Sequence, residues 1–138
     1  MTDCPECAAL PADLAAIVGW RHFHTPAACW ELLRLVAQRH LGIVLPFENV
    51  LEQRRRWREL VAAGQGRFGG VLWRRAAAPA RAYDGVLFRF EATDHMGIAL
   101  DGRRFLHVPR PEVGACLGEI ARWAERAESW GIYRLAGR

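Results

Sequence analysis

Two short runs of alternating apolar residues, joined by Asp101-Gly102, constrain the fold of this chain more than any other feature. The runs span residues 95–100 and 103–108, and an Asp-Gly pair between such runs is a strong hairpin signal. We therefore expect two adjacent antiparallel strands here. Because successive side chains of a strand point to opposite faces, the pairing register decides which residues of this hairpin share a face.

The length of the hairpin loop decides whether His95 and His107 lie on the same face. A two-residue turn at Asp101-Gly102 makes them point to opposite faces. A three-residue loop that also includes Leu100 places His95 directly opposite His107, so that both line one face. That face then holds histidines and small residues, and the other holds core-like aliphatic residues. The first face has Gly97, Ala99 and Phe105, and the second has Met96, Ile98, Leu100, Leu106 and Val108.

Cys29 lies where a helix is expected to begin. Thr25 and Pro26 are typical of a helix start, and an apolar stripe continues to about residue 40, where Gly42 suits the end. A thiol in the first turn feels the positive end of the helix dipole, which favours the reactive thiolate. A buried cysteine on a helix face is more often inert, so position alone does not decide the role of Cys29.

The two histidines strengthen the catalytic hypothesis for Cys29. In the register that puts both on one face, the small residues beside them leave room for a helix start that carries a nucleophile. His95 would then hold the thiol proton, and His107 would orient the His95 ring. The alternative is that His95 only begins a strand and His107 fills a half-exposed position.

The rest of the chain changes from helices to strands along its length. Helices are expected at residues 11–19, 26–40, 48–63 and 118–129, with an aromatic, histidine-rich connector at 20–24. Extended runs are expected at 68–73, 85–91 and 130–135, with a loop at 74–83. Residues 1–138 are expected to form one domain, with residues 1–10 as a flexible or docking arm.

Charge and composition limit the classes of partner that the protein is expected to bind. The net charge is +4, and all 19 basic residues are Arg. The basic run at residues 54–58 is interleaved with Glu48, Glu52 and Glu59, which favours a solvated helix face or a protein contact over nucleic acid. No stretch is long and apolar enough for a membrane span, and the first residues lack a secretory signal, so we expect synthesis in the cytoplasm of the cell that makes it.

The cysteines do not indicate a cofactor. Cys4 and Cys7 form half of a metal motif, which a redox pair or a disulfide loop would explain equally well. A zinc or iron-sulfur site needs two more ligands, from Cys116, a histidine or another chain. We therefore expect no bound metal and no cofactor, with Cys4 and Cys7 as the residual candidate ligands.

Two blocks resemble the NlpC-type papain-like cysteine peptidases, and in particular their tail-associated branch in tailed phages. The first block is Cys29-Trp30-Glu31-Leu32-Leu33-Arg34-Leu35-Val36 with Leu41-Gly42-Ile43 and Leu45-Pro46, which resembles the nucleophile helix. The second comprises residues 84–88, 95–100 and 102–107, which resemble the two central strands of the family. The resemblance covers residues 15–134 and is specific only in these two blocks.

The resemblance implies a papain-like α+β fold, in which N-terminal helices pack against a small antiparallel sheet. It also implies a cysteine endopeptidase that cleaves peptidoglycan stem peptides, with Cys29 as nucleophile, His95 as base and His107 as orienting residue. Phage members act at the virion tail tip, together with tail-tip or hub proteins. The alternative to a phage protein is a bacterial enzyme that remodels the cell wall.

Some positions depart from the family pattern. Ala28 stands where the family has Asp, and Glu31 stands where this branch has Gly. The upstream tyrosine that helps to hold the oxyanion is missing, and His22 or His24 would have to donate in its place. A catalytically weak or inactive tail-tip or hub protein that keeps the peptidase scaffold is therefore the alternative function.

Overall fold

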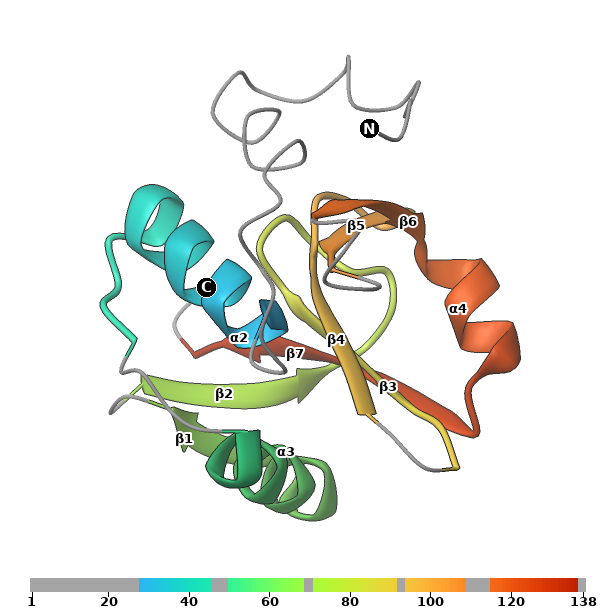
Figure 1. The fold of residues 1–138 in the computed structure, drawn as a ribbon, viewed down its shortest axis with the longest axis horizontal. Helices are drawn as coiled ribbons and strands as arrows, with labels where there is room; N and C mark the ends of the chain where they lie inside the picture. The colour runs from blue at the N-terminus through green and yellow to red at the C-terminus, as the bar shows by residue number, and fades with distance from the viewer. Residues whose placement is uncertain (1–27, 46–49, 69–70, 92–93, 109–114, 137–138) are drawn as a thin grey trace.

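The computed structural model describes residues 28–45, 50–68, 71–91, 94–108 and 115–136, which build a seven-stranded sheet (Figure 1). The strand order is β1-β2-β7-β3-β4-β5-β6, and neighbouring strands are antiparallel. The strands are β1 (Gln65–Phe68), β2 (Val71–Ala76), β3 (Gly85–Arg89), β4 (Asp94–Ala99), β5 (Arg104–His107), β6 (Cys116–Glu119) and β7 (Ser129–Leu135).

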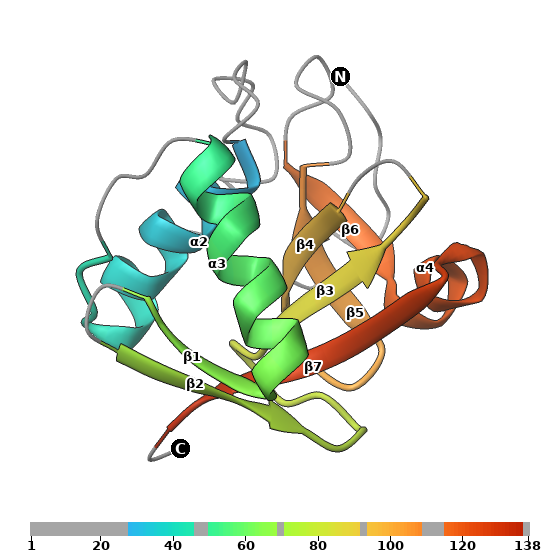
Figure 2. The same ribbon diagram turned by 90° about the horizontal axis from the view of Figure 1, so that it is seen from below.

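Helices lie on both faces of this sheet. The helical segments are α2 (Ala28–Val36), which continues into the π-helical turn η2 (Ala37–Leu41), then α3 (Val50–Ala63) and α4 (Ile120–Arg126). Helices α2 and α3 contribute to one hydrophobic cluster and α4 to another, on the opposite face. Figure 2 shows α3 lying across the strands, with α4 beside the N-terminal end of β7.

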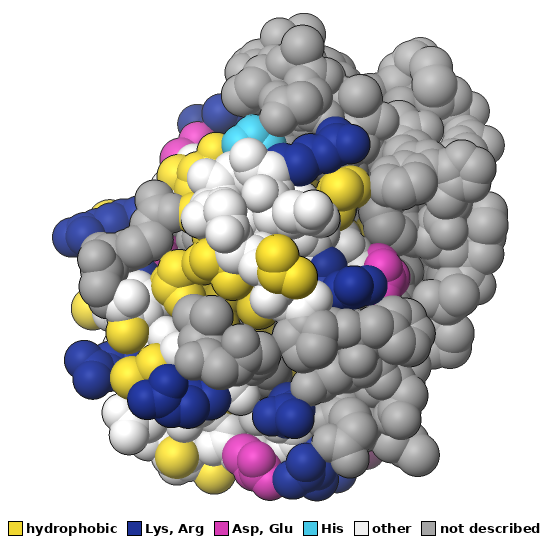
Figure 3. Space-filling model, turned by 90° about the vertical axis from the view of Figure 1, so that its left-hand side faces the viewer, with side chains coloured by type: hydrophobic (Ala, Val, Ile, Leu, Met, Phe, Trp, Pro, Cys, Tyr) yellow, Lys and Arg dark blue, Asp and Glu magenta, His cyan; other side chains and the backbone are white. Residues whose placement is uncertain are grey.

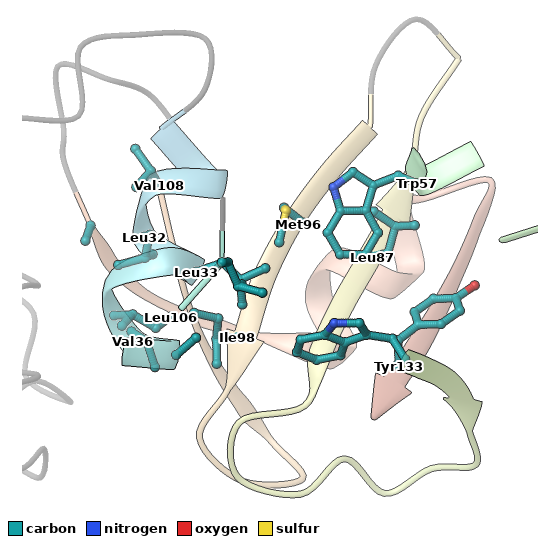
Figure 4. Packing of buried hydrophobic residues seen from close by; sticks show 14 of the residues in the cluster. Leu32, Leu33, Val36, Trp57, Leu87, Met96, Ile98, Leu106, Val108 and Tyr133 are labelled. Atoms are coloured by element: carbon teal, nitrogen blue, oxygen red, sulfur yellow. The ribbon is translucent and has the colours of Figure 1, made fainter. Parts of the chain in front are cut away.

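The larger cluster joins α2 and α3 to the aliphatic face of the sheet (Figure 4). Leu32, Leu33 and Val36 recur at helical spacing and are 1–2 % exposed. Their partners from the hairpin are Met96, Ile98, Leu106 and Val108, the aliphatic residues that the sequence predicts on one face. Burial of each such side chain contributes about 1.5–3 kcal/mol, so this contact determines where α2 lies.

The smaller cluster has a group of aromatic rings that pack against one another. Phe88 and Phe105 are fully buried, with ring centroids 5.3 Å apart, and Trp123 of α4 lies 5.9 Å from Phe88. Trp130 also stacks on Phe88, with ring centroids 6.1 Å apart. This cluster occupies the sheet face that also carries the two histidines of the hairpin.

The fold expected from the family resemblance is wrong. We expected N-terminal helices packed against a small antiparallel sheet, but the sheet is the dominant element and α2, α3 and α4 are short by comparison. Part of the difference is that residues 65–76 form the hairpin β1–β2 rather than one strand and a loop. Residues 118 and 119, the expected start of the last helix, belong instead to strand β6, because they pair with β5, and the helix α4 begins at Ile120.

Several smaller expectations are confirmed. Gly42 adopts a left-handed conformation with φ 67°, which ends the first helical segment, and Gly64 does the same after α3 with φ 73°. The final extended run is strand β7. The predicted helix at 11–19, the connector at 20–24 and the arm at 1–10 lie outside the described residues.

The hairpin register differs from both registers considered. Ala99 pairs with Phe105, and the Leu100 N–H donates to the Arg104 carbonyl at 2.9 Å, so the loop comprises residues 101–103 instead of 100–102. The Asp101 carboxylate accepts hydrogen bonds from the backbone N–H groups of Arg103 and Arg104, each at 2.8 Å, and these bonds shape the loop. The shift keeps His95 and His107 on one face, as predicted, but Gly97 rather than His95 lies across from His107.

Strand β7 lies inside the sheet, between β2 and β3, and an ion pair fixes it there. It pairs with β2 on one side and with β3 on the other. Arg134 of β7 donates two hydrogen bonds, of 3.0 and 2.8 Å, to the carboxylate of Asp84. The Asp84 side chain is 3 % exposed and also accepts the backbone N–H of Arg81. The carboxylate therefore joins β7 to the loop that precedes β3.

The surface is rich in arginine, and on the side shown in Figure 3 dark blue arginine side chains surround hydrophobic groups. On α3, Arg55 and Glu59 form an exposed ion pair at 2.9 Å, which agrees with the solvated helix face expected from the sequence. None of the helices in the described part of the chain has both the length and the apolar character needed to cross a bilayer.

We expect Asp84→Asn to lower the free energy of unfolding by about 2–4 kcal/mol, because it leaves the Arg134 guanidinium without its charged partner. Urea unfolding followed by far-ultraviolet circular dichroism measures this loss. Glu59→Gln, which removes an exposed ion pair, is the matched control and should cost less than about 1 kcal/mol. Equal losses in the two variants would contradict the role assigned to Asp84.

Candidate functional site

His95 and His107 form a hydrogen-bonded pair on the α4 side of the sheet. His95 Nε2 lies 2.7 Å from His107 Nδ1, and the two rings are nearly perpendicular. His95 belongs to β4 and His107 to the neighbouring strand β5, so backbone pairing fixes both Cα positions. The histidines therefore meet, as expected for the register that places both on one face, although the register in the structure is a third one.

Two glycines make room for the rings. A side chain at Gly118 would place its Cβ 2.7 Å from both His107 Nε2 and Phe105 Cε1. A Cβ at Gly97 would lie 2.4 Å from Phe105 Cδ2. Both distances are too short for any side chain, so these strand positions accept only glycine unless the rings move.

Trp123 of α4 covers the pair. Its ring stacks on His95, with centroids 4.5 Å apart, and meets His107 edge-on at 4.9 Å. The Arg126 guanidinium lies 4.8 Å from the Trp123 ring centre. Phe105 also contacts His107, with ring centroids 4.3 Å apart. His107 is consequently 2 % exposed, whereas His95 is half-buried.

This environment keeps both imidazoles neutral at physiological pH. Burial lowers the pKa of His95 to about 4. Burial, followed by repulsion from His95 and Arg126, lowers the pKa of His107 to about 3. A neutral imidazole has one N–H donor and one nitrogen acceptor, which is the state that a base needs before it accepts a proton.

Cys116 extends the pair to a third group that the sequence analysis did not assign to the site. Its position on β6 is directly opposite His107, and its Sγ lies 3.8 Å from His107 Nε2. The order of contacts is therefore Cys116 Sγ, His107 Nε2, His107 Nδ1 and His95 Nε2. Each nitrogen of His107 thus faces a polar partner.

This chain of contacts allows two proton arrangements. In the first, Cys116 donates its thiol proton to His107, and His107 Nδ1–H donates to His95. In the second, His95 Nε2–H donates to His107 Nδ1, and His107 Nε2–H donates to the Cys116 sulfur. Only the second leaves His95 Nδ1 without a proton and therefore able to act as a base.

Cys29 is the second residue of α2 (Ala28–Val36) and so lies in its first turn. We expected the histidine face to receive this helix start. The body of α2 packs instead on the opposite, aliphatic face, and the Phe105 and His107 rings fill the space beside the glycines. The Cys29 thiol lies outside the described side chains, so its pairing with His95 remains a prediction.

The other candidate residues add little to the site. Glu31, where the family has glycine, forms an ion pair with Arg34 at 3.1 Å, and Arg34 also donates to the carbonyl of Leu45. The candidate oxyanion donors His22 and His24 and the candidate ligands Cys4 and Cys7 lie outside the described residues. Among the side chains that are described, no three His, Cys, Asp or Glu residues are arranged to hold a metal ion.

Comparison with known proteins assigns no family: no family model, no curated protein and no solved structure matches this chain. The resemblance to NlpC-type peptidases therefore rests on the two sequence blocks alone.

We expect the free energy of unfolding to decrease as the pH is lowered below about 6.5, because the unfolded chain binds protons that the folded histidines exclude. The stabilisation is complete above the unfolded pKa and is lost as pH falls toward the folded pKa values. Urea unfolding should give a slope of about 1–3 kcal/mol per pH unit between about pH 6 and 4.5. The double variant His95→Gln/His107→Gln should lose most of this slope, and an unchanged slope would contradict the depressed pKa values.

We expect Gly118→Ala to destabilise the protein by about 1–3 kcal/mol, because the new methyl group must displace the His107 and Phe105 rings. Gly85→Ala is the matched strand control, since its Cβ would lie 3.7 Å from the nearest heavy atom. Urea unfolding gives the loss, and the histidine ring signals in the nuclear magnetic resonance spectrum should shift only for Gly118→Ala. Similar behaviour of both variants would show that the site is not tightly packed.

Proposed function

We propose that this protein is a cysteine endopeptidase in which Cys29 is the nucleophile, His95 the base and His107 the residue that orients His95. The single observation that supports it best is the 2.7 Å hydrogen bond between the two histidines. A histidine whose second nitrogen is held by a polar partner is the arrangement that thiol and serine hydrolases use to position a base. The helix-start position of Cys29 favours its thiolate.

The proposed reaction proceeds through a thioester. His95 Nδ1 accepts the Cys29 proton, and the sulfur attacks the carbonyl carbon of the substrate peptide bond. The C–N bond then breaks, and the imidazolium returns its proton to the leaving amine. A water molecule, deprotonated by His95, hydrolyses the thioester and regenerates the thiol. The low pKa of His95 favours the return of the proton to the amine but makes the first transfer harder.

The proposed substrate is the stem peptide of bacterial peptidoglycan, and the proposed setting is the tail tip of a phage virion, in contact with other tail-tip or hub proteins. Both come from the sequence blocks around Cys29 and His95. Synthesis in the host cytoplasm followed by delivery in the particle would bring the enzyme to the cell wall.

The second candidate is a structural tail-tip or hub protein with little or no hydrolytic activity. Two observations favour it. The body of α2 packs on the sheet face opposite the histidines, and Trp123 covers the ring of His95. In this case the histidine pair is a neutral, hydrogen-bonded part of the core.

Purified full-length protein incubated with muropeptides, with mass spectrometry of the products, separates these candidates. We expect peptide-bond cleavage by the wild type, and a loss of at least about 100-fold for Cys29→Ser and for His95→Gln. Cys7→Ser is the matched thiol control and should retain the wild-type rate.

Three outcomes would overturn the proposal. Cleavage that survives Cys29→Ser would show that Cys29 is not the nucleophile. Cleavage abolished by Cys116→Ser but not by Cys29→Ser moves the nucleophile to β6. No cleavage by the wild type, alone or assembled in its particle, supports the structural candidate.

A further inference from the structure

A second candidate site lies on the other face of the sheet from the histidine pair. It is a pocket of roughly 120 Å³ between α3 and the strands β2, β7, β3 and β4. Its apolar lining includes Trp57, Leu87 and Tyr133, which lie at one end of the cluster in Figure 4. Three arginines also line it, Arg58 from α3, Arg75 from β2 and Arg89 from β3.

One of these arginines is fixed in place by its surroundings. Arg75 lies over the Tyr133 ring, 5.7 Å from its centre, and donates a hydrogen bond of 3.2 Å to the carbonyl of Trp130. Gly131 lacks the side chain that would collide with it, since a Cβ there would lie 2.8 Å from the guanidinium carbon. A guanidinium has five N–H donors, so most of those of Arg75 remain for a ligand.

The charge at this pocket is not balanced. Among the described residues of its lining, Asp94 is the one acid, against the three arginines. Within the described part of the chain, neither Arg58 nor Arg89 forms a salt bridge. Positive charge beside an apolar cavity favours a ligand that carries both an anionic and an apolar group.

Size and geometry narrow the ligand further. A protein cavity of about 150 Å³ is able to hold benzene, so this pocket has room for about one ring or one branched aliphatic side chain. Planar guanidinium groups bind carboxylates through paired hydrogen bonds. The last residue of a peptide, when apolar, presents both groups within a few bonds of each other.

We propose that this pocket binds the C-terminal carboxylate of a peptide together with its last, apolar side chain. The arginines hold the carboxylate, and the side chain lies against Trp57, Leu87 and Tyr133. None of the residues assigned to the peptidase reaction lines this pocket, so the inference stands whether or not the protein hydrolyses a substrate.

Isothermal titration calorimetry of the full-length protein at low ionic strength tests the proposal, with N-acetylphenylalanine as the probe and N-acetylphenylalanine amide as its neutral counterpart. We expect saturable binding of the acid at a dissociation constant of about 0.1–1 mM. The amide should bind at least about tenfold more weakly, and added salt should weaken binding of the acid.

Substitutions then locate the binding. Arg89→Gln should weaken the binding of N-acetylphenylalanine at least about fivefold. Gly131→Ala should do the same, because its methyl group displaces the Arg75 guanidinium from this position without unfolding the protein. Arg103→Gln, an exposed arginine in the loop between β4 and β5, is the matched control and should leave the affinity unchanged.

Three results would overturn the proposal. Equal affinity for the acid and the amide would show that the arginines do not bind the carboxylate. No saturation at about 10 mM acid, a concentration well above the expected constant, removes the site. An equal loss in Arg103→Gln and Arg89→Gln shows attraction by the overall positive charge rather than binding in the pocket.

Discussion

The pairing of β7 with both β2 and β3 is the constraint on which the rest of the structure depends. Strands β1 and β2 form one hairpin, strands β3 to β6 follow one another across the other part of the sheet, and β7 joins the two parts. The ion pair between Arg134 and Asp84 fixes the end of β7 against the beginning of β3. The arginine pocket exists only because of this arrangement, since β7 supplies Gly131 and Tyr133 beneath Arg75.

Local patterns predicted the parts of the fold that depend on neighbouring residues. The alternation in residues 95–108 placed the aliphatic side chains on one face and the histidines on the other, and Gly42 and Gly64 end their helices as expected. The central place of β7 was not predictable in this way, because it depends on pairing between distant segments. The hairpin register was missed because the Asp101 side chain, rather than a tight turn, shapes the loop.

The candidate site was predictable to the same extent. Spacing brought His95 and His107 together, since they lie on adjacent strands of one hairpin. Cys116 and Trp123 were missed because they come from β6 and α4, which meet the histidines only in the folded chain. The one available signal was Gly118, a glycine within a strand, which often marks a place where another group comes close. The side of the sheet that α2 covers was also beyond local pattern, because it follows from packing.

The position of β7 also has a consequence for how the protein is made. Ribosomes synthesise a chain from its N-terminus, so β7 emerges after every other strand of the sheet. Until then the facing edges of β2 and β3 have unpaired N–H and C=O groups, and such edges are prone to pair with other chains. The nascent protein therefore completes its sheet only after β7 has been synthesised, and its dependence on chaperones should be greatest in the interval before residues 129–135 leave the exit tunnel.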